Sequence, residues 1–216
     1  MNQINKILSF KSLILFLTFF LVGTNIYSET TLEKIKRTGK ATVGTEAAFP
    51  PFEFVEDGKI VGYGKDILDY IIADLGVELN QLDLPWQGIL PGVLAGKFDF
   101  VATSVSVRAE RAKKYAFTVP IAEGTNWVMK RMGDTSIMSA DDLSGKVVCT
   151  QLASASEKAT QEWEKDLKSR GLEGFKELKL FTAHPEATLA VANGTCDAQT
   201  QPCLLYTSPS PRDLST

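Results

Sequence analysis

Histidine, a common metal ligand in proteins, occurs only once in this 216-residue sequence. His184 stands directly before a proline, at a position where a helix is expected to begin. No cluster of cysteine, histidine or acidic residues with metal-ligand spacing accompanies it. We therefore expect no metal site, and we expect His184 to be structural or solvated.

Catalytic motifs are missing as well. The sequence has no nucleophile paired with a histidine, no glycine-rich phosphate loop and no pair of metal ligands. The absence of such machinery favours binding over catalysis. We expect a protein that is not an enzyme and that needs no cofactor.

An excess of positive charge is also lacking, since 23 Lys and Arg residues face 26 Asp and Glu residues, for a net charge of −3. No basic stripe runs along any predicted helix or strand. Nucleic-acid binding would require such a stripe. We expect no nucleic-acid partner.

The only long apolar run is "LILFLTFFLVGT", near the start of the chain. Lys6 and Lys11 precede it, and Ile26 and Ser28 follow it in the positions typical of a cleavage site. The run is too short to span a bilayer comfortably. Residues 1–28 are therefore predicted to be a secretory signal peptide, and the mature protein is expected to be a soluble periplasmic monomer.

Two cysteines, Cys149 and Cys196, fall inside apolar runs that read as strands. Export would permit a disulfide between them. Burial inside two strands is equally consistent with two free thiols. Both alternatives remain open from the sequence.

The end of the chain departs from the pattern before it, because "CLLYTSPSPRD" has no apolar periodicity and is rich in serine and proline. Its eleven residues can be back-translated into a string that looks like a transposase-type sequencing adaptor. We expect residues 202–216 to be an artefact of this kind, with the native reading interrupted after Gln201. A disordered tail is the alternative.

Between the two ends, short apolar runs alternate with amphipathic stretches. A hairpin turning on Asp57-Gly58 precedes a helix that Gly76 should end. The predicted strands are 41–45, 77–84, 98–105, 126–130, 146–151, 177–181 and 196–200, and the predicted helices are 65–76, 89–96, 154–171 and 185–194. This order predicts an α/β fold with mainly parallel sheets flanked by helices, divided into a first lobe (29–121), a crossing (122–124) and a second lobe (125–201).

The segment "DFVATSVSVRAER" carries the clearest candidate site. Thr103, Ser104 and Ser106 lie where a parallel strand should end, and ligands of open α/β sheets bind outside the carboxyl ends of strands. Arg111 follows, and its guanidinium can give a carboxylate two parallel hydrogen bonds. The alternative is a serine-capped surface helix with a solvated arginine.

Five stretches resemble segments of a known protein family and occur in the order that they have in that family. They are "FPPFEF", "GKIVGYGKDILDYIIADLG", "ILPGVLAGKFDFVATSVSVRAERAKKYAFT", "SGKVVCTQLASASEKA" and "ANGTCDAQT", and the resemblance covers residues 31–201. Together they resemble the periplasmic solute-binding proteins of polar amino-acid ABC transporters (family 3). The resemblance implies a type II architecture, in which two α/β lobes close on one amino acid and deliver it to a permease in the inner membrane.

The resemblance also implies roles for individual residues. Arg111 would bind the α-carboxylate of the ligand, with Thr103, Ser104 and Ser106 at the family's hydroxyl and backbone contacts. Phe49 and Trp86 match positions whose large side chains flank the side chain of the ligand, and ordinary core packing is their alternative.

In the second lobe, Ala153-Ser154-Ala155 replaces the family's usual glycine and two hydroxyl residues. Ser154 is kept as a ligand contact, although with Glu157 it also fits a capping box. Arg108 and Gly64 depart from the family, and Pro202 stands where an ammonium-binding aspartate is usual.

Two other functions fit the same scaffold. One is a dehydratase of cyclohexadienyl acids, for which Glu46 or Glu53 would have to supply the proton, although both are expected to be solvated or capping groups. The other is the sensor module of a membrane receptor.

Overall fold

The computed structural model describes residues 29–206. The expected signal peptide and residues 207–216 of the expected artefactual tail lie outside the described residues. Two units are separated within helix α2 (Thr31–Thr38), and the second unit begins at Ile35. Every strand of the described part belongs to the second unit. No helix between residues 29 and 206 is long and apolar enough to cross a bilayer.

The first sheet consists of three parallel strands in the order β5 (Glu78–Asp83), β1 (Lys40–Thr45) and β6 (Phe100–Val101). Helix α3 (Tyr63–Leu75) packs on it through Leu68 and Ile72, which share a core cluster with Val43. These two residues lie on one face of a helix because they are four positions apart. As predicted, α3 ends at Gly76, whose φ of 63° lies in the left-handed region that favours glycine.

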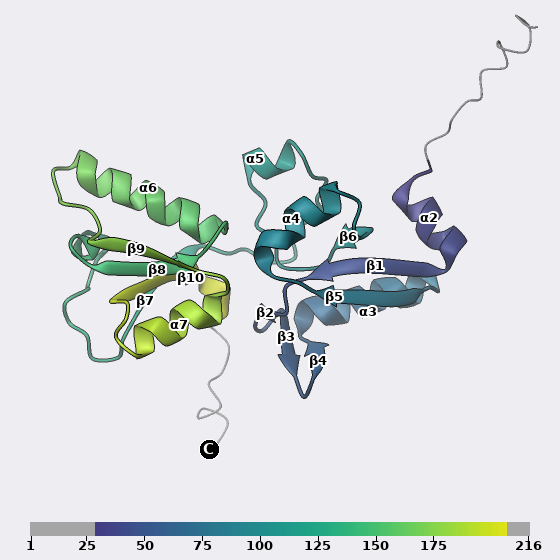
Figure 1. Cartoon of the computed structure of the whole chain (residues 1–216), viewed down its shortest axis with the longest axis horizontal. Coiled ribbons are helices and arrows are strands. Elements are labelled where there is room, and N and C mark those ends of the chain that lie inside the picture. Colours follow the sequence, from purple (N-terminus) through teal and green to yellow (C-terminus); the bar gives the residue numbers. More distant parts are fainter. Residues whose placement is uncertain (1–28, 207–216) are drawn as a thin grey trace, which may run out of the picture. The chain divides into compact units, whose positions relative to one another are not determined.

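Helix α4 (Trp86–Leu94) also packs beside β1 (Figure 1). The ring of Phe98 fits against two glycines there. A Cβ atom at Gly44 would lie 2.7 Å from the ring, and one at Gly92 would lie 2.6 Å from it. These two glycines therefore allow the close approach of β1 and α4 to Phe98.

A small antiparallel sheet of β2 (Ala48–Phe49), β3 (Glu53–Glu56) and β4 (Lys59–Val61) follows β1 in the chain. Asp57 and Gly58 connect β3 to β4, with φ angles of 49° and 74°. Two successive positive φ angles are typical of the tight turns that join hairpin strands. The predicted hairpin is thus confirmed.

The second large sheet has the order β7 (Asn126–Lys130), β10 (Ala198–Pro202), β8 (Val147–Gln151) and β9 (Glu177–Phe181). β8 runs parallel to β9 and β10, whereas β7 is antiparallel to β10. The prediction of a mainly parallel sheet is confirmed, with β7 as the exception.

Helices α6 (Ala155–Ser169) and α7 (His184–Ala192) cover opposite faces of this sheet (Figure 1). Val148 of β8 lies in the core cluster that contains Leu167 of α6, and the next residue, Cys149, lies in the cluster that contains Val191 of α7. Successive side chains of a strand point to opposite faces, so β8 contributes to both cores.

Three predicted elements differ from the structure. The strand expected over residues 196–200 lies at Ala198–Pro202. The helix expected to begin near Ile89 begins at Trp86, directly after Pro85. The strand expected over residues 98–105 pairs only at Phe100 and Val101. Beyond Ala102, the side chain of Thr103 and the backbone N–H and side chain of Ser104 donate to the carboxylate of Glu53, and the pairing with β1 does not continue. Short helices complete the fold at Ala109–Ala112 (α5), Ala140–Leu143 (η1) and Cys203–Tyr206 (η2).

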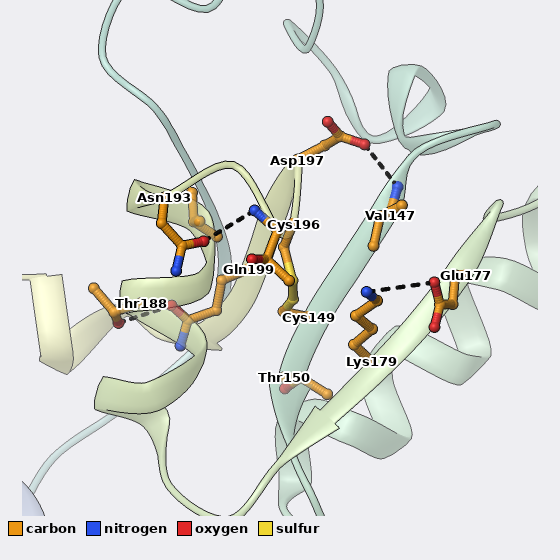
Figure 2. Close-up of a disulfide and its surroundings, with 12 residues drawn as sticks. Val147, Cys149, Thr150, Glu177, Lys179, Thr188, Asn193, Cys196, Asp197 and Gln199 are labelled. Atoms are coloured by element: carbon orange, nitrogen blue, oxygen red, sulfur yellow. Dashed lines mark hydrogen bonds and ion pairs between the residues drawn. A yellow bond between two sulfur atoms is a disulfide. The ribbon is translucent and has the colours of Figure 1, made fainter.

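The structure joins Cys149 and Cys196 in a disulfide, which decides between the two alternatives left by the sequence. Figure 2 shows the bond between β8 and the segment that leads into β10. Both cysteines are fully buried. Beside them, the backbone N–H of Val147 donates to Asp197 Oδ2 at 2.8 Å, which ties the same two segments together.

Removing this disulfide should destabilise the protein. The two cysteines are 47 positions apart, and closing a loop of this length typically contributes about 2–4 kcal/mol to the free energy of unfolding. Cys149→Ala/Cys196→Ala should lower that free energy by this amount in urea denaturation. Cys203→Ser, which changes only the free cysteine, is the control. Dithiothreitol should destabilise the wild type and not the double variant, and an insensitive wild type would show two free thiols.

Candidate functional site

A cavity with about 370 Å³ of empty space, including its opening to solvent, lies where the ends of several strands meet. All seven predicted site residues line it: Phe49, Trp86, Thr103, Ser104, Ser106, Arg111 and Ser154. Sequence reasoning gave no ligand-binding role to seven further lining residues: Glu46, Glu53, Gln151, Ala155, Ser156, His184 and Pro202. The structure therefore brings the predicted residues together and adds a second set.

Arg111 is the only arginine or lysine among the residues that line this cavity. Its Cζ lies 5.1 Å from the centroid of the Trp86 ring, a cation–π distance. Its guanidinium donates to the carbonyl of Ser106 at 3.2 Å and to that of Ala153 at 3.5 Å. Burial lowers the pKa of Arg111, and the nearby Arg108 lowers it further. An arginine remains a cation under these conditions, so the site offers a positioned positive charge to an anionic group.

Thr103 and Ser104 do not present free hydroxyls to the cavity, because both donate to Glu53. Thr103 Oγ1 lies 2.8 Å from Glu53 Oε1, and Ser104 Oγ lies 3.1 Å from Oε2. The backbone N–H of Ser104 also donates to Oε1. Burial raises the pKa of Glu53, and these three bonds to its carboxylate oppose that rise.

The expectation that Glu53 is a solvated or capping group is wrong, since its exposed fraction is 2%. Gly64 explains how the carboxylate fits. A Cβ atom at position 64 would lie 2.6 Å from Glu53 Oε2. The absence of a side chain at Gly64 therefore leaves the space that the Glu53 carboxylate fills.

Glu46, also expected to be solvated or capping, is buried at the end of β1. The side-chain amide of Gln151 donates to Glu46 Oε1 and, at 3.1 Å, to the carbonyl of Thr182. Burial raises the pKa of Glu46 to about 7, the bond from Gln151 opposes this rise, and the charges of Glu53 and Asp83 add to it. The cavity thus contains a carboxyl group that titrates near neutral pH.

Ser154 caps helix α6, as predicted. Its Oγ accepts from the backbone N–H of Glu157 at 3.0 Å and donates to the carbonyl of Gln151 at 2.7 Å. Before it, Ala153 has a φ of 60°, in the left-handed region that favours glycine. The carbonyl of Ala153 accepts from Trp86 Nε1 at 2.9 Å, so this loop and α4 meet at the cavity.

A group of charged residues lies beside the cavity, formed by Arg108, Glu110, Lys158 and Glu162. Arg108 donates to the carbonyl of Ala155 at 3.1 Å and lies 3.7 Å from Glu110 and 4.0 Å from Glu162. Lys158 forms an ion pair with Glu110. These contacts connect residues around α5 with helix α6.

His184 is buried rather than solvated, and it lines the cavity. Its ring contacts that of Phe49 edge to face, with 6.0 Å between centroids. Burial lowers the pKa of His184 to about 4, so the imidazole is neutral at pH 7. No group of histidine, cysteine and acidic residues suited to a metal ion occurs in the part of the chain that the structure describes.

Glu46→Gln should change how stability depends on pH. Because the folded pKa of Glu46 is about 7 and its ordinary value is 4.5, its contribution to stability is complete below pH 4.5 and is lost as pH rises through 7. His184 acts in the opposite sense, since its contribution is lost as pH falls from 6.5 towards 4.

Relative to the wild type, the free energy of unfolding of Glu46→Gln should therefore rise by about 1 kcal/mol per pH unit between pH 5 and 7. Urea denaturation across that interval measures the effect. Exposed Glu173→Gln is the control. Parallel curves for Glu46→Gln and the wild type would contradict the raised pKa.

Residues 41–195 match the sequence profile of the bacterial extracellular solute-binding proteins, family 3. A probable amino-acid ABC transporter-binding protein from Haemophilus influenzae is 29% identical over 164 residues, which cover 73% of this chain and 61% of the relative. The chain spans about half to three fifths of the length of the curated relatives it matches.

Solved structures show the same fold. An ancestral arginine-binding protein bound to arginine is 34% identical, with a TM-score of 0.71 over 78% of this chain and 72% of that one. The ancestral amino acid-binding protein AncCDT-1, a precursor of cyclohexadienyl dehydratase, is 29% identical, with a TM-score of 0.73 over 82% of this chain and 75% of that one. The fold is that of the type II periplasmic binding proteins, with parallel sheets flanked by helices. Since the profile match covers well over half of the sequence, the chain belongs to the bacterial extracellular solute-binding proteins, family 3.

Proposed function

We propose that this chain is the substrate-binding component of an ABC transporter for amino acids, exported by residues 1–28 and acting in the periplasm. The observation that carries the proposal is the guanidinium of Arg111, held over Trp86 inside the cavity. A carboxylate is the natural partner of this group because it accepts two parallel hydrogen bonds from one guanidinium. Phe49 and Trp86 supply apolar surface for the rest of the ligand.

The proposed mechanism is closure of two lobes, residues 29–121 and 125–201, around the ligand. Bonds between the two segments support it: Trp86 donates to Ala153, Gln151 donates to Glu46, and Gln87 donates to the carbonyl of Thr182 at 3.1 Å. A ligand that contacts both lobes favours the closed form over the open one. The permease would then recognise the closed form and receive the ligand from it.

The names of the relatives support a receptor rather than an enzyme, since they describe amino-acid-binding proteins. Both carboxyl groups that a dehydratase could use are committed to hydrogen bonds, Glu46 with Gln151 and Glu53 with Thr103 and Ser104. A ligand released from the complex by denaturation should therefore be chemically unchanged. Formation of an aromatic product from a prephenate-like acid would identify the dehydratase instead.

Arg111→Ala should weaken amino-acid binding at least about a hundredfold, because it leaves the buried carboxylate of the ligand without its charged partner. The ligand for isothermal titration is the amino acid that most raises the melting temperature in a screen of the twenty L-amino acids and L-cystine. Arg170→Ala is the control, since Arg170 is exposed and bonds to Asp141 and Asp166.

Two outcomes would contradict the proposal. If no amino acid stabilises or binds the wild type, the proposed function is wrong. If Arg111→Ala binds with unchanged affinity, the carboxylate lies elsewhere in the cavity. Circular dichroism establishes that the variant is folded before either conclusion is drawn.

Arg108→Thr should weaken binding by a smaller factor, about threefold to tenfold, and should speed ligand dissociation. The variant loses the hydrogen bond from Arg108 to the carbonyl of Ala155 and the ion pair of Arg108 with Glu162. Both interactions connect the two proposed lobes. Because the Arg108–Glu162 ion pair is partly exposed, salt screens it, and added salt should therefore weaken ligand binding by the wild type more than ligand binding by the variant. Stopped-flow dissociation at low and high salt measures both effects.

The control for Arg108→Thr is Lys40→Ala, which removes an exposed ion pair with Glu78 inside the first sheet. Its dissociation rate should match that of the wild type at each salt concentration. Equal rates for all three proteins would show that Arg108 takes no part in closure.

A further inference from the structure

The side chain of Gln151 joins the two proposed lobes through protein atoms alone. Its Nε2 donates to Glu46 Oε1 in the first lobe and, at 3.1 Å, to the carbonyl of Thr182 in the second. The Thr182 carbonyl also accepts from Gln87 Nε2 of the first lobe at 3.1 Å. Glu46, Gln151, Thr182 and Gln87 therefore form one hydrogen-bond network that crosses twice between the lobes.

Glu46 is the ionisable side chain of this network. Its carboxyl is buried, and its partner in the second lobe is the neutral amide of Gln151. A neutral donor offsets the loss of water around a carboxylate less than a cation does. Burial accordingly raises the pKa of Glu46 to about 7, the bond from Gln151 opposes this rise, and repulsion by Glu53 and Asp83 adds to it.

Separation of the lobes reverses these conditions at Glu46. Gln151 belongs to the second lobe, so it moves away and water reaches the Glu46 carboxyl. The pKa then returns towards its ordinary value of 4.5. Between pH 4.5 and 7 the closed form holds a proton that the open form lacks, so closing takes up a proton in this range.

The acidic groups next to Glu46 keep their surroundings when the lobes move. Glu53 Oε1 accepts from Thr103 Oγ1 at 2.8 Å, and Asp83 Oδ1 accepts from the backbone N–H of Ala47 at 2.9 Å. All four residues lie in the first lobe. Closure leaves these two bonds intact, so the protonation of Glu53 and Asp83 is coupled to closure less than that of Glu46.

The two basic side chains of the cavity keep their charge state in this range. Arg111 remains a cation. Burial lowers the pKa of His184 to about 4, so its imidazole is neutral above pH 5. Among the residues that line the cavity, Glu46 is therefore the group whose charge depends both on closure and on pH.

Two ion pairs outside the network also connect the lobes, Arg108 with Glu162 and Lys158 with Glu110. Protonation of a carboxylate abolishes its ion pair, so acid weakens these contacts. The ion pairs thus favour closure at higher pH, whereas Glu46 favours closure at lower pH. The sign of the pH dependence distinguishes the two effects.

We propose that Glu46 and Gln151 form a proton-dependent latch, which favours closed lobes when Glu46 is neutral and open lobes when Glu46 is ionised. Closing on an ionised Glu46 costs the free energy of removing its charge from water. A receptor with this latch retains its ligand more tightly in an acidic medium than at neutral pH. The inference rests on the proposed function, because it adopts the closure of two lobes.

Small-angle X-ray scattering of the full chain, with no amino acid added, tests the latch between pH 5 and 8. The radius of gyration falls when the lobes approach, so the scattering curves give the ratio of closed to open forms. We expect this ratio to fall by about threefold to tenfold per pH unit between pH 5 and 7. Circular dichroism at each pH establishes that the chain is folded.

Glu46→Gln is the matched variant, because its amide oxygen still accepts from Gln151 but the side chain cannot ionise. Its ratio of closed to open forms should be the same at every pH and should equal that of the wild type at pH 5. Gln151→Met removes the donor at similar length and should lower the ratio at pH 5. Exposed Glu173→Gln is the control and should follow the wild type.

Several outcomes would overturn the latch. A wild type whose closed fraction is independent of pH, or rises with pH, has no such latch. The same holds if Glu46→Gln keeps the pH dependence of the wild type, or if Gln151→Met closes as readily as the wild type at pH 5.

Failure of the proposed function is a separate result. If none of the twenty L-amino acids and L-cystine binds at pH 5 or at pH 8, the chain is not an amino-acid receptor, whatever the scattering shows. If one of them binds while closure of the unliganded chain is independent of pH, the receptor stands and the latch is wrong.

Discussion

The site depends on one topological constraint, the parallel pairing of strands within each large sheet. Because β1 is parallel to β5 and β6, the residues that follow these three strands emerge at the same edge. Those residues include Glu46, Trp86 and Thr103. In the second large sheet, β8 is parallel to β9 and β10 in the same way, and Ser154, His184 and Pro202 come at or just after their ends. Both sets of strand ends line one cavity.

The buried polar side chains near these strand ends differ in how many hydrogen bonds they receive. The Glu53 carboxylate receives three hydrogen bonds from Thr103 and Ser104. Glu46 receives one from Gln151, and its pKa rises to about 7. Nδ1 of His184 receives none within the described residues. Full pairing is expected of groups that hold the fold, whereas incomplete pairing is typical of groups that interact with a ligand. Glu53 is therefore best regarded as structural support for the Thr103-Ser104 loop.

Much of the candidate site could be predicted because the strand-end rule needs only the order of strands and helices. Applied to residues 99–111, it indicated Thr103, Ser104, Ser106 and Arg111 as a candidate site, and all four line the cavity. The same rule, applied to the ends of β1, β8 and β9, would have found Glu46, Gln151 and His184. These three were missed because a lone acid, amide or histidine after a strand has no motif around it. For the same reason, Glu46 was expected to be a solvated or capping group and His184 to be structural or solvated.

The sequence by itself determined the α/β class, the hairpin at Asp57-Gly58, the Gly76 end of α3 and the Ser154 cap of α6. Each of these follows from local periodicity or from the conformational preference of one residue, and such effects act over a few positions. The tertiary structure alone decided the Cys149–Cys196 disulfide, the burial of Glu46 and Glu53, and the unpaired nitrogen of His184. These properties depend on contacts between residues about 50 to 105 positions apart, such as Thr103 with Glu53 and Gln151 with Glu46. Desolvation and hydrogen bonding at that range exist only when the chain is folded, so no local pattern can encode them.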